Sequence, residues 1–258
     1  MLEFDSATTA ILEDVYQGAD FTRRRRASFD LLAPARGEVI IDIGSGPGHM
    51  LIDIARAVGS DGHAIGIDPS APMRDTAQNL ASGRGNVTVL DGSATELPLE
   101  DSSADKAVSV QVFEYLPDIP AALAECHRVL RTGGRLVIAD MHFGSFHWAS
   151  DDPARMARMI KAWDHHLVER AVPEKLPSLG HAAGFAVEQI VPVTFVDNHL
   201  RPGGLAWMMM TPMERYVIEN KLVPAAIARD WAAEQTRRVE QGRFYFSITH
   251  IVTVLRRS

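Results

Sequence analysis

The sequence is poor in the features that mark several classes of protein. A single cysteine, Cys126, excludes an internal disulfide and a cysteine-based zinc site. No apolar stretch approaches the ~20 residues needed to cross a bilayer. Basic residues number 26 against 33 acidic ones, so the net charge is −7. Because phosphate contacts need a basic surface, we expect no nucleic-acid partner. Without a spanning stretch, we expect no membrane partner either.

The beginning of the sequence also lacks a targeting signal. Residues 1–5 do not show the basic-then-apolar order of a secretory leader, so a cytoplasmic protein is expected. With 258 residues and 46% hydrophobic content, the chain can bury a full core, with insertions or a lid. The four arginines at 23–26 are an exception to the acidic balance. A solvated helix face is favoured for them over an anion site.

A buried strand followed by a glycine loop is the most informative feature that is present. Residues 39–43 are apolar β-formers with one acid, and Gly44, Gly46 and Gly48 follow at alternate positions. Glycines there let the backbone turn tightly and approach a ligand. Pro47 suits the first turn of a helix, and the loop N–H groups and helix dipole suit an anion. The apolar residues that continue at helical spacing are Leu51, Ile54, Ala55 and Val58.

The order of the glycines separates two classes of cofactor. A dinucleotide site needs Gly or Ala three places after the second glycine, where helix and strand pack closely. His49 occupies that place and is too large. A nicotinamide or flavin site is therefore disfavoured. A purely structural turn remains the alternative interpretation of the loop.

Strand and helix patterns alternate through much of the chain. After the first strand, strands are expected at 63–67, 87–90, 106–110, 135–139, 187–196 and 244–255. Helices are expected at 5–32, 71–81, 118–131, 152–168, 174–183 and 224–240, and one more begins at a capping box at Thr211. Residues 142–148 appear irregular. This alternation predicts an α/β fold, a Rossmann-like, seven-stranded, mostly parallel sheet with helices on both faces.

The same pattern predicts the domain organisation. Residues 1–34 form an N-terminal helical cap, and residues 35–145 form the cofactor-binding core. Residues 146–172 and 199–242 form helical lid insertions over the strand ends, because long insertions in compact domains are usually functional. The rest of the sheet domain comprises residues 173–198 and 243–258.

Four segments together resemble class I S-adenosylmethionine (SAM)-dependent methyltransferases over residues 35–140. The first is the Asp-x-Gly-x-Gly-x-Gly loop that begins at Asp42. The second is Asp68, 26 positions later, at the end of the next strand. The third is the segment 91–98, in which Ser93 replaces the aspartate usual in that family. The fourth is the turn at 130–137, similar to a structural Gly-Gly turn. Quinone-biosynthesis and secondary-metabolite small-molecule methyltransferases are the most similar groups.

The resemblance implies a site for SAM and a role for several residues. The glycine loop would hold the methionyl end, and Asp68 would bind both ribose hydroxyls, with helix capping as its alternative role. Adenine would be held by Ser93 and Ala94 or by Asp91. Gln111 would face the methionyl end, and Tyr16 with one of the arginines would close over the cofactor. The implied cofactor-binding residues are Tyr16, Asp42, Gly44, Ser45, Gly46, Gly48, Asp68, Pro69, Met73, Ser93, Ala94 and Gln111.

The predicted chemistry makes few demands on catalytic side chains. The sulfonium already makes the methyl group electrophilic, so the protein mainly aligns a nucleophile. A base is needed only where the acceptor carries a proton that must leave, and His142 is the first choice. No metal site is expected, because adjacent His165 and His166 point about 100° apart on a helix. The other candidate bases are Tyr115, Asp140, His147, His165 and His166.

Aromatic and methionine side chains in the predicted lid favour an apolar or aromatic small-molecule substrate. Methylation at oxygen or carbon is favoured over nitrogen. Two alternatives stay open: a SAM-binding protein that transfers no methyl group, and a nicotinamide-dependent oxidoreductase. A second copy of the chain, in a homodimer, is a further partner to be considered. The lid side chains are Phe143, Phe146, Trp148, Trp163, Trp207, Met208, Met209 and Met210.

Overall fold

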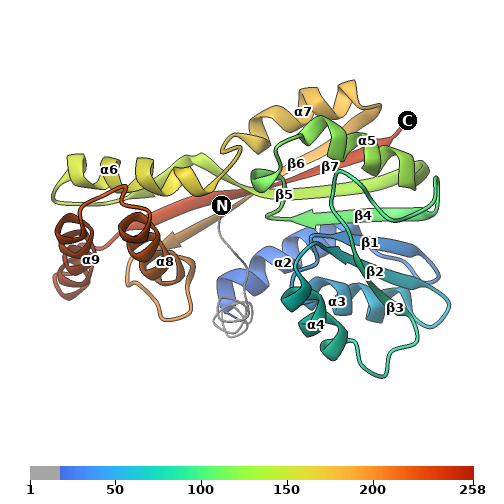
Figure 1. Ribbon diagram of the computed structural model, residues 1–258, viewed down its shortest axis with the longest axis horizontal. Helices are drawn as coiled ribbons and strands as arrows, with labels where there is room; N and C mark the ends of the chain where they lie inside the picture. The colour runs from blue at the N-terminus through green and yellow to red at the C-terminus, as the bar shows by residue number, and fades with distance from the viewer. Residues whose placement is uncertain (1–17) are drawn as a thin grey trace.

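The computed structural model describes residues 18–258 and is built on one seven-stranded sheet (Figure 1). The strand order is β3-β2-β1-β4-β5-β7-β6, and β7 runs antiparallel to both of its neighbours. The predicted Rossmann-like, mostly parallel sheet is confirmed. The strands are β1 Val39–Ile43, β2 His63–Asp68, β3 Val87–Asp91, β4 Ala104–Val110, β5 Leu130–Trp148, β6 Phe185–Asp197 and β7 Phe246–Arg257.

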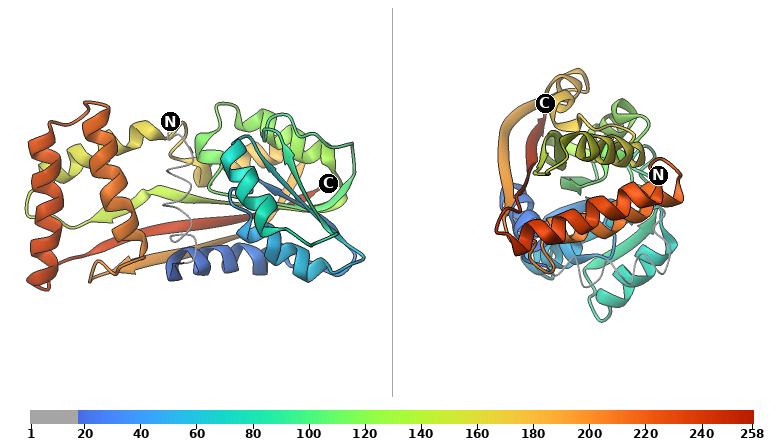
Figure 2. Two further views of the ribbon diagram at one scale, coloured as in Figure 1. Left: turned by 60° about the horizontal axis from the view of Figure 1, so that its bottom comes forward. Right: turned by 90° about the vertical axis from the view of Figure 1, so that its left-hand side faces the viewer.

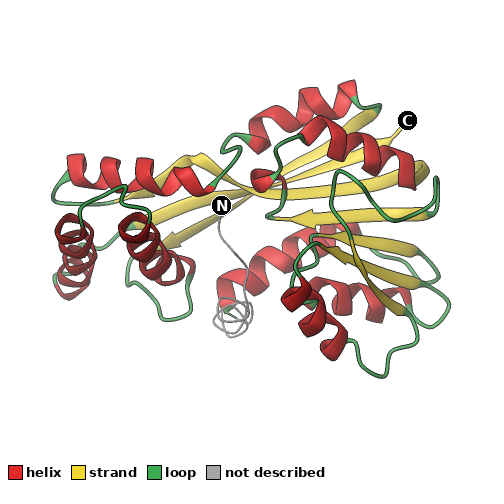
Figure 3. Cartoon of the chain, in the orientation of Figure 1, coloured by secondary structure: helices red, strands yellow, loops and turns green. Residues whose placement is uncertain are grey.

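Helices cover both faces of this sheet (Figure 3). Helices α2, α3 and α4 lie on one face, and α5 and α7 lie on the other (Figure 1). Within residues 18–258, none of the helices has both the length and the apolar character that crossing a bilayer requires. The helices on the sheet are α2 Ala19–Leu32, α3 His49–Val58, α4 Ala71–Leu80, α5 Ile119–Val129 and α7 Val172–Ala182, and a short 3₁₀ turn, η1 Phe113–Tyr115, follows β4.

The unit β1–loop–α3 forms as its sequence predicts, with one change. Strand β1 is almost wholly buried, and the apolar face of α3 packs on the sheet. Gly48 is the N-cap of α3, with φ at +90°, a conformation that glycine adopts without strain. The prediction that Pro47 lies in the first turn of the helix is wrong. Pro47 precedes the cap and belongs to the turn itself.

The strand order reverses between β1 and β4, which places a crevice beyond their carboxyl ends. β1 pairs with β2 on one side and with β4 on the other, parallel in both cases. The connections from β1 and β4 therefore leave in opposite directions, over opposite faces of the sheet. In open α/β sheets ligands bind at such a reversal.

Strand β5 is much longer than the sequence predicts. The expected irregular segment, 142–148, continues the strand to Trp148 because β7 supplies a partner. His142 pairs with Thr249, and after a register shift His147 pairs with Ser247. The pairing partners of this segment lie about a hundred positions away in the sequence. A strand stabilised by such a remote partner needs no alternating pattern of its own, so its sequence carries little signal.

The helix predicted to begin at Thr211 begins earlier, at Leu205, as α8 Leu205–Glu219. Pro212 lies inside this helix, where it removes one backbone hydrogen bond. Burial of Leu205, Ala206 and Met208 in the preceding turns offsets that loss. The capping box therefore did not mark a helix start, because tertiary burial outweighed the local signal.

Three helices pack together at the end of the molecule toward which β4 points (Figures 1 and 2). We call α6, α8 and α9 the helical lobe; they rest on the far ends of the long strands β5, β6 and β7. Its core is aromatic: Trp148 contacts Trp231 and Phe246, with ring centroids 5.2 and 5.1 Å apart. The remaining elements are α6 Pro153–Trp163, the 3₁₀ turn η2 Asp164–His166, and α9 Ala225–Glu240.

Candidate cofactor-binding site

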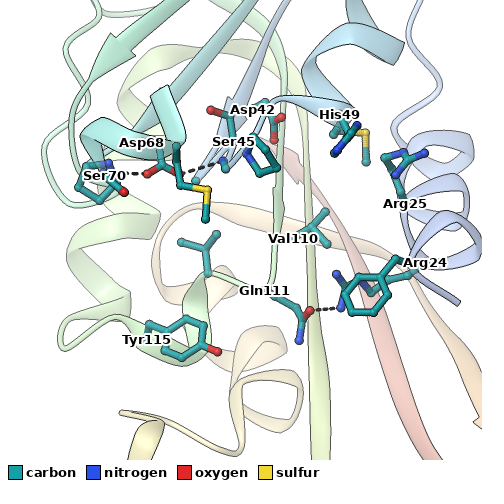
Figure 4. Close-up of a pocket in the computed structure, with 18 of the residues that line it drawn as sticks. Arg24, Arg25, Asp42, Ser45, His49, Asp68, Ser70, Val110, Gln111 and Tyr115 are labelled. Atoms are coloured by element: carbon teal, nitrogen blue, oxygen red, sulfur yellow. Dashed lines mark hydrogen bonds between the residues drawn. The ribbon is translucent and has the colours of Figure 1, made fainter. Parts of the chain in front are cut away.

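A cavity of about 360 Å³ opens at the carboxyl ends of β1, β2 and β4, under one side of α2 (Figure 4). That volume falls in the range of small-molecule sites. The wall combines an apolar surface with a few buried acids and arginines. The residues that line it are Phe21, Arg24, Arg25, Asp42, Gly44, Ser45, Gly46, Pro47, His49, Met50, Asp68, Pro69, Ser70, Met73, Val110, Gln111, Val112, Tyr115 and Leu116.

Asp68, the last residue of β2, holds the glycine loop and the start of α4 together. Its Oδ2 accepts the Gly46 N–H at 2.9 Å, and its Oδ1 accepts the Ser70 N–H at 2.8 Å. Burial raises the pKa of the Asp68 carboxyl, and these two N–H groups and Arg74 oppose the rise. Each carboxylate oxygen keeps a further lone pair, so Asp68 can still accept hydrogen bonds from a ligand diol.

Asp42, in β1, lies beneath the loop. Its side chain is buried, and Oδ2 has no hydrogen-bond partner among the residues described. Burial raises the pKa of Asp42 to about 7, with a further contribution from nearby Asp68. Such a buried acid readily accepts a hydrogen bond from a ligand, because folding has already removed the water around it.

The backbone N–H groups of the loop are already engaged within the protein. Gly44 and Ser45 donate to the Ile67 carbonyl at 2.7 and 3.1 Å, and the Gly48 N–H donates to the Ser45 carbonyl at 3.0 Å. The expectation that these groups are open donors for an anion is wrong. They bind the loop to the end of β2 instead. A Cβ at Gly44 would collide with the Val112 side chain, so this glycine serves chain packing.

Positive charge reaches the cavity from α2. Arg24 is 5% exposed, lines the cavity and donates from Nη1 to Gln111 Oε1 (Figure 4). Its guanidinium also lies over the Phe21 ring, 4.6 Å from the centroid. The prediction that the arginine run is a solvated helix face is wrong at this position. Arg23 and Arg26 are exposed, as the prediction requires.

A buried polar chain extends from Arg24 toward β5. Gln111, with φ at +55°, is a non-glycine residue in the left-handed region. Its Nε2 lies 3.4 Å from Glu114 Oε1, and the Glu114 N–H lies 3.4 Å from Asp140 Oδ1. Burial raises the pKa of both carboxyls, and nearby Arg24 opposes that rise. Two buried acids thus lie behind the cavity wall: Glu114 directly precedes the wall residue Tyr115, and Asp140 accepts from the Glu114 N–H.

The structure brings together most, but not all, of the predicted site residues. Gly48, Ser93, Ala94 and His142 do not line the cavity, and Tyr16 lies outside the described residues. Ser93 Oγ bonds instead to Thr95 Oγ1 at 2.8 Å, within its own loop. The predicted residues that do line the cavity are Asp42, Gly44, Ser45, Gly46, Asp68, Pro69, Met73 and Gln111.

His142 faces away from the cavity, toward α7. Its Nε2 lies 2.9 Å from Glu174 Oε1. Tyr115, another candidate at the strand ends, does line the cavity. Among the residues described, no group of three or more His, Cys, Asp and Glu is arranged to hold a metal ion.

Several residues of the cavity wall belong to no motif that could be recognised in the sequence. Phe21 belongs to a helix that reaches the site from outside the core, and Val110 and Leu116 flank the end of β4. Each is an ordinary apolar residue in its own segment. Among the wall residues outside the predicted cofactor-binding set, the sequence had singled out the arginine run, Pro47, His49 and Tyr115.

A family model described as a methyltransferase domain matches residues 41–138. An O-methyltransferase of Aspergillus nomiae is 32% identical over 64% of this chain and 72% of its own length. An uncharacterised protein from a Streptomyces fradiae transposon is 33% identical over 87% of this chain and 64% of its own length. An O-methyltransferase of Penicillium expansum is 32% identical over 66% of this chain and 59% of its own length. The chain thus spans well under the full length of these relatives.

Solved structures share the fold at low sequence identity. The YcgJ protein of Bacillus subtilis superposes with a TM-score of 0.63 at 18% identity, covering 92% of this chain and 98% of the other. A [4+2]-cyclase, SpnF, gives a TM-score of 0.59 at 20% identity, covering 91% of this chain and 80% of the other.

The fold and the cavity at the strand reversal define a Rossmann-like domain with a small-molecule site beyond its strand ends. Taken with the relatives, they assign the family. The chain belongs to the SAM-dependent methyltransferases, as the glycine loop and its companion motifs indicated, and SAM is the cofactor of that family.

Proposed function

We propose that this protein transfers the methyl group of SAM to an apolar or aromatic small molecule, at oxygen or carbon in preference to nitrogen. One observation carries the proposal above the others. The cavity at the strand reversal combines Asp68, whose carboxylate keeps lone pairs for a diol, with an apolar wall suited to adenine. A site of this composition suits a nucleoside with a free ribose.

The buried charges support a specific placement of the cofactor. Asp68 would accept both ribose hydroxyls. Arg24 would attract the methionyl carboxylate, a role that the loop N–H groups cannot take because they have partners already. Gln111, held by Arg24, would lie beside the amino-acid end. Pro69 and Met73 would cover the adenine, in place of the predicted Ser93 and Ala94.

The acceptor would bind between the cavity and the helical lobe. In this proposal residues 146–172 and 199–242 form the substrate-side wall, as the predicted lid insertions. Apolar side chains of the lobe, among them Met209, Met210 and Tyr216, pack against its core while remaining partly exposed. Such a wall binds apolar rings and gives a charged amine little compensation for lost water. A cytoplasmic location and a homodimer stay predictions.

A SAM-binding protein that carries out another reaction is the second candidate. One observation favours keeping it: the same fold occurs in a structure described as a [4+2]-cyclase. At 20% identity that likeness concerns the fold alone. The nicotinamide alternative has no comparable support, because His49 occupies the place where close helix–strand packing needs a small residue.

Transfer of a labelled methyl group tests the proposal directly. The purified protein is incubated with methyl-labelled SAM and a metabolite extract, and the products are separated by mass spectrometry. We expect one labelled apolar product and stoichiometric S-adenosylhomocysteine. Asp68→Ala should lower SAM affinity by about tenfold or more, the value of one hydrogen bond to a charged group.

The matched control for this substitution is Asp61→Ala. Asp61 is an exposed aspartate outside the cavity wall, so this variant should keep the SAM affinity of the wild type. Unchanged SAM affinity in Asp68→Ala would refute the assigned ribose role. SAM binding without any labelled product would favour the second candidate function.

A further inference from the structure

An aromatic box lies where the helical lobe meets the cofactor-side of the sheet. We use this name for Tyr115, Phe143, Trp163 and Tyr216, which surround His166. The His166 ring stacks on Trp163 with centroids 3.9 Å apart and planes 36° apart. The rings of Tyr115, Phe143 and Tyr216 lie 6.1, 6.3 and 5.9 Å from it. The box draws on η1, β5, α6 and α8, four separate elements.

Tyr115 connects the box to the cofactor cavity. It lines that cavity, and its ring is also one wall of the box. A molecule lying against Tyr115 on the box side is therefore next to the cofactor site. Phe143, Trp163 and His166 are buried, whereas Tyr115 and Tyr216 are partly exposed, so a planar ligand would enter the box past the two tyrosines.

The orientation of the His166 ring prepares one nitrogen to accept a proton. Nδ1 is within hydrogen-bond reach of the Trp163 carbonyl, an acceptor, so Nδ1 carries the hydrogen of the neutral ring. Nε2 then holds the free lone pair. Burial lowers the pKa of His166 to about 4, so the ring is uncharged at neutral pH.

Trp163 supplies a complementary donor. Its indole N–H is buried and has no acceptor among the residues described. An unsatisfied buried donor is costly, and a bound hydroxyl oxygen would satisfy it. The stacked pair thus offers one donor and one acceptor, the combination that a hydroxyl group needs.

We propose that the aromatic box binds the methyl acceptor as a hydroxyarene and that His166 Nε2 is the catalytic base that receives its hydroxyl proton. This inference rests on the proposed methyl transfer and identifies its acceptor class. It replaces His142, which bonds to Glu174 on the other side of β5. His166 was one of several histidines in the sequence, and only the box distinguishes it.

The step balances without any further reactant. The O–H bond breaks and its proton moves to Nε2, while an oxygen lone pair forms the new bond to the methyl carbon. The C–S bond breaks and its electron pair stays on sulfur, which becomes a neutral thioether. Positive charge thus moves from the sulfonium to the imidazole. Because burial disfavours the imidazolium, the proton reaches Nε2 only as the oxygen–methyl bond forms and the sulfonium loses its charge.

The groups that face His166 are mostly uncharged. Tyr115 comes from η1 and Tyr216 from α8, where burial raises the pKa of the Tyr216 phenol. On its own turn, Asp164 is paired with Arg170 at 3.3 Å, and His165 is exposed. Burial is therefore the main influence on His166, and the box gives the resting ring no counter-charge.

A binding experiment tests the site without a known substrate. The probes are 2-naphthol and 2-methoxynaphthalene, which differ only in the hydroxyl hydrogen and a methyl group. They are titrated into the protein saturated with S-adenosylhomocysteine. We expect 2-naphthol to bind about tenfold more tightly, the value of one hydrogen bond. The variant His166→Phe keeps an aromatic ring and should lose this preference.

The neighbouring variant, His165→Phe, is the matched control and should keep the preference, because its side chain is exposed. Failure of the wild type to bind either naphthalene would overturn the aromatic site. A preference that survives His166→Phe would overturn the role of Nε2.

The rate of methyl transfer distinguishes a catalytic role of His166 from a role in packing alone. With labelled SAM and 2-naphthol, His166→Phe should lose about 100-fold or more in rate at neutral pH, as for removal of a general base. The loss should shrink as the pH approaches that at which the naphthol ionises by itself. Added imidazole should partly restore His166→Gly. A loss that stays constant with pH would contradict proton transfer to His166.

The two proposals fail differently. If the wild type transfers no label to any compound of the metabolite extract but still prefers 2-naphthol, the methyl transfer fails and the site stands. If transfer occurs and the preference is absent, only the inference about the box fails.

Discussion

At the scale of single residues, burial has the largest effect on the pKa values of the acids near the cavity. Asp42, Glu114 and Asp140 all have raised pKa values, and in each case loss of water is the largest cause. Arg24 opposes this at two of them without reversing it. Such groups hold their proton more tightly in the folded chain than in the unfolded one.

The folded protein should therefore become less stable as the pH rises. For an acid whose pKa is raised on folding, the stabilisation is complete below its unfolded pKa, near 4, and is lost as the pH passes through the folded value. Glu114→Gln keeps the shape of the side chain and stays neutral. Between pH 5 and pH 8, the free energy of unfolding of this variant should therefore fall by roughly 1–3 kcal/mol less than that of the wild type. Urea unfolding at several pH values measures this.

The control for this prediction is an exposed carboxylate. Glu100→Gln should leave the decline with pH as it is in the wild type, because Glu100 is in contact with water. Equal declines in wild type and Glu114→Gln would show that Glu114 does not hold its proton in the folded state.

At the scale of elements, the sequence predicted which helices and strands form better than it predicted where each one begins and ends. The helix after the glycine loop and the helix capped by Asp118 appear where their local patterns place them, and Asp118 does accept the Ala121 N–H at 2.9 Å. β5 and α8 were misjudged. Their lengths depend on β7 and on burial in the helical lobe, which are partners remote in sequence.

The helical lobe depends on one buried carboxylate. Glu234 of α9 is 2% exposed and accepts Arg155 Nη2 at 2.7 Å and Ser150 Oγ at 2.9 Å, so it joins α9 to α6 and the loop before it. Glu234→Ala should cost on the order of 3 kcal/mol in the free energy of unfolding, because Arg155 would remain partly buried and unpaired. Chemical denaturation followed by tryptophan fluorescence measures it.

A surface pair in the same lobe serves as the comparison. Arg215 and Glu219 of α8 form an ion pair at 2.7 Å with both side chains more than half exposed. Glu219→Ala should cost about 0.5 kcal/mol or less. Similar losses from the two substitutions would mean that burial of Glu234 adds nothing to its pairing.

At the scale of the whole molecule, the cofactor site and the helical lobe share one sheet. The glycine loop lies at one end of the short parallel strands, and the long strands β5, β6 and β7 extend past it to carry the lobe (Figure 2). A ligand at the junction therefore contacts α2, the loop and η1 together. Its binding free energy stabilises the folded chain as a unit.

SAM should accordingly raise the melting temperature, and NADH should not. At a concentration about 100 times its dissociation constant, a ligand adds about 2.7 kcal/mol. For a chain of this size that corresponds to a rise of roughly 5–10 °C. Differential scanning fluorimetry with each cofactor measures it. A rise with NADH and none with SAM would reverse the assignment of the cofactor.

The sequence by itself determined the class of fold, the family and the position of the glycine loop. These follow from interactions between near neighbours: continuous burial in β1, helical spacing in α3, and a turn that only glycines accept at that spacing. Such patterns are complete within about twenty residues, so a linear chain displays them.

Tertiary structure alone decided which side chains meet at the site. Arg24 and Gln111 are 87 positions apart, and the aromatic box joins residues from Tyr115 to Tyr216. The same is true of the loop amides, whose acceptor, the Ile67 carbonyl, lies on the next strand. Contacts of this kind depend on strand pairing and burial over long separations, which no local pattern encodes.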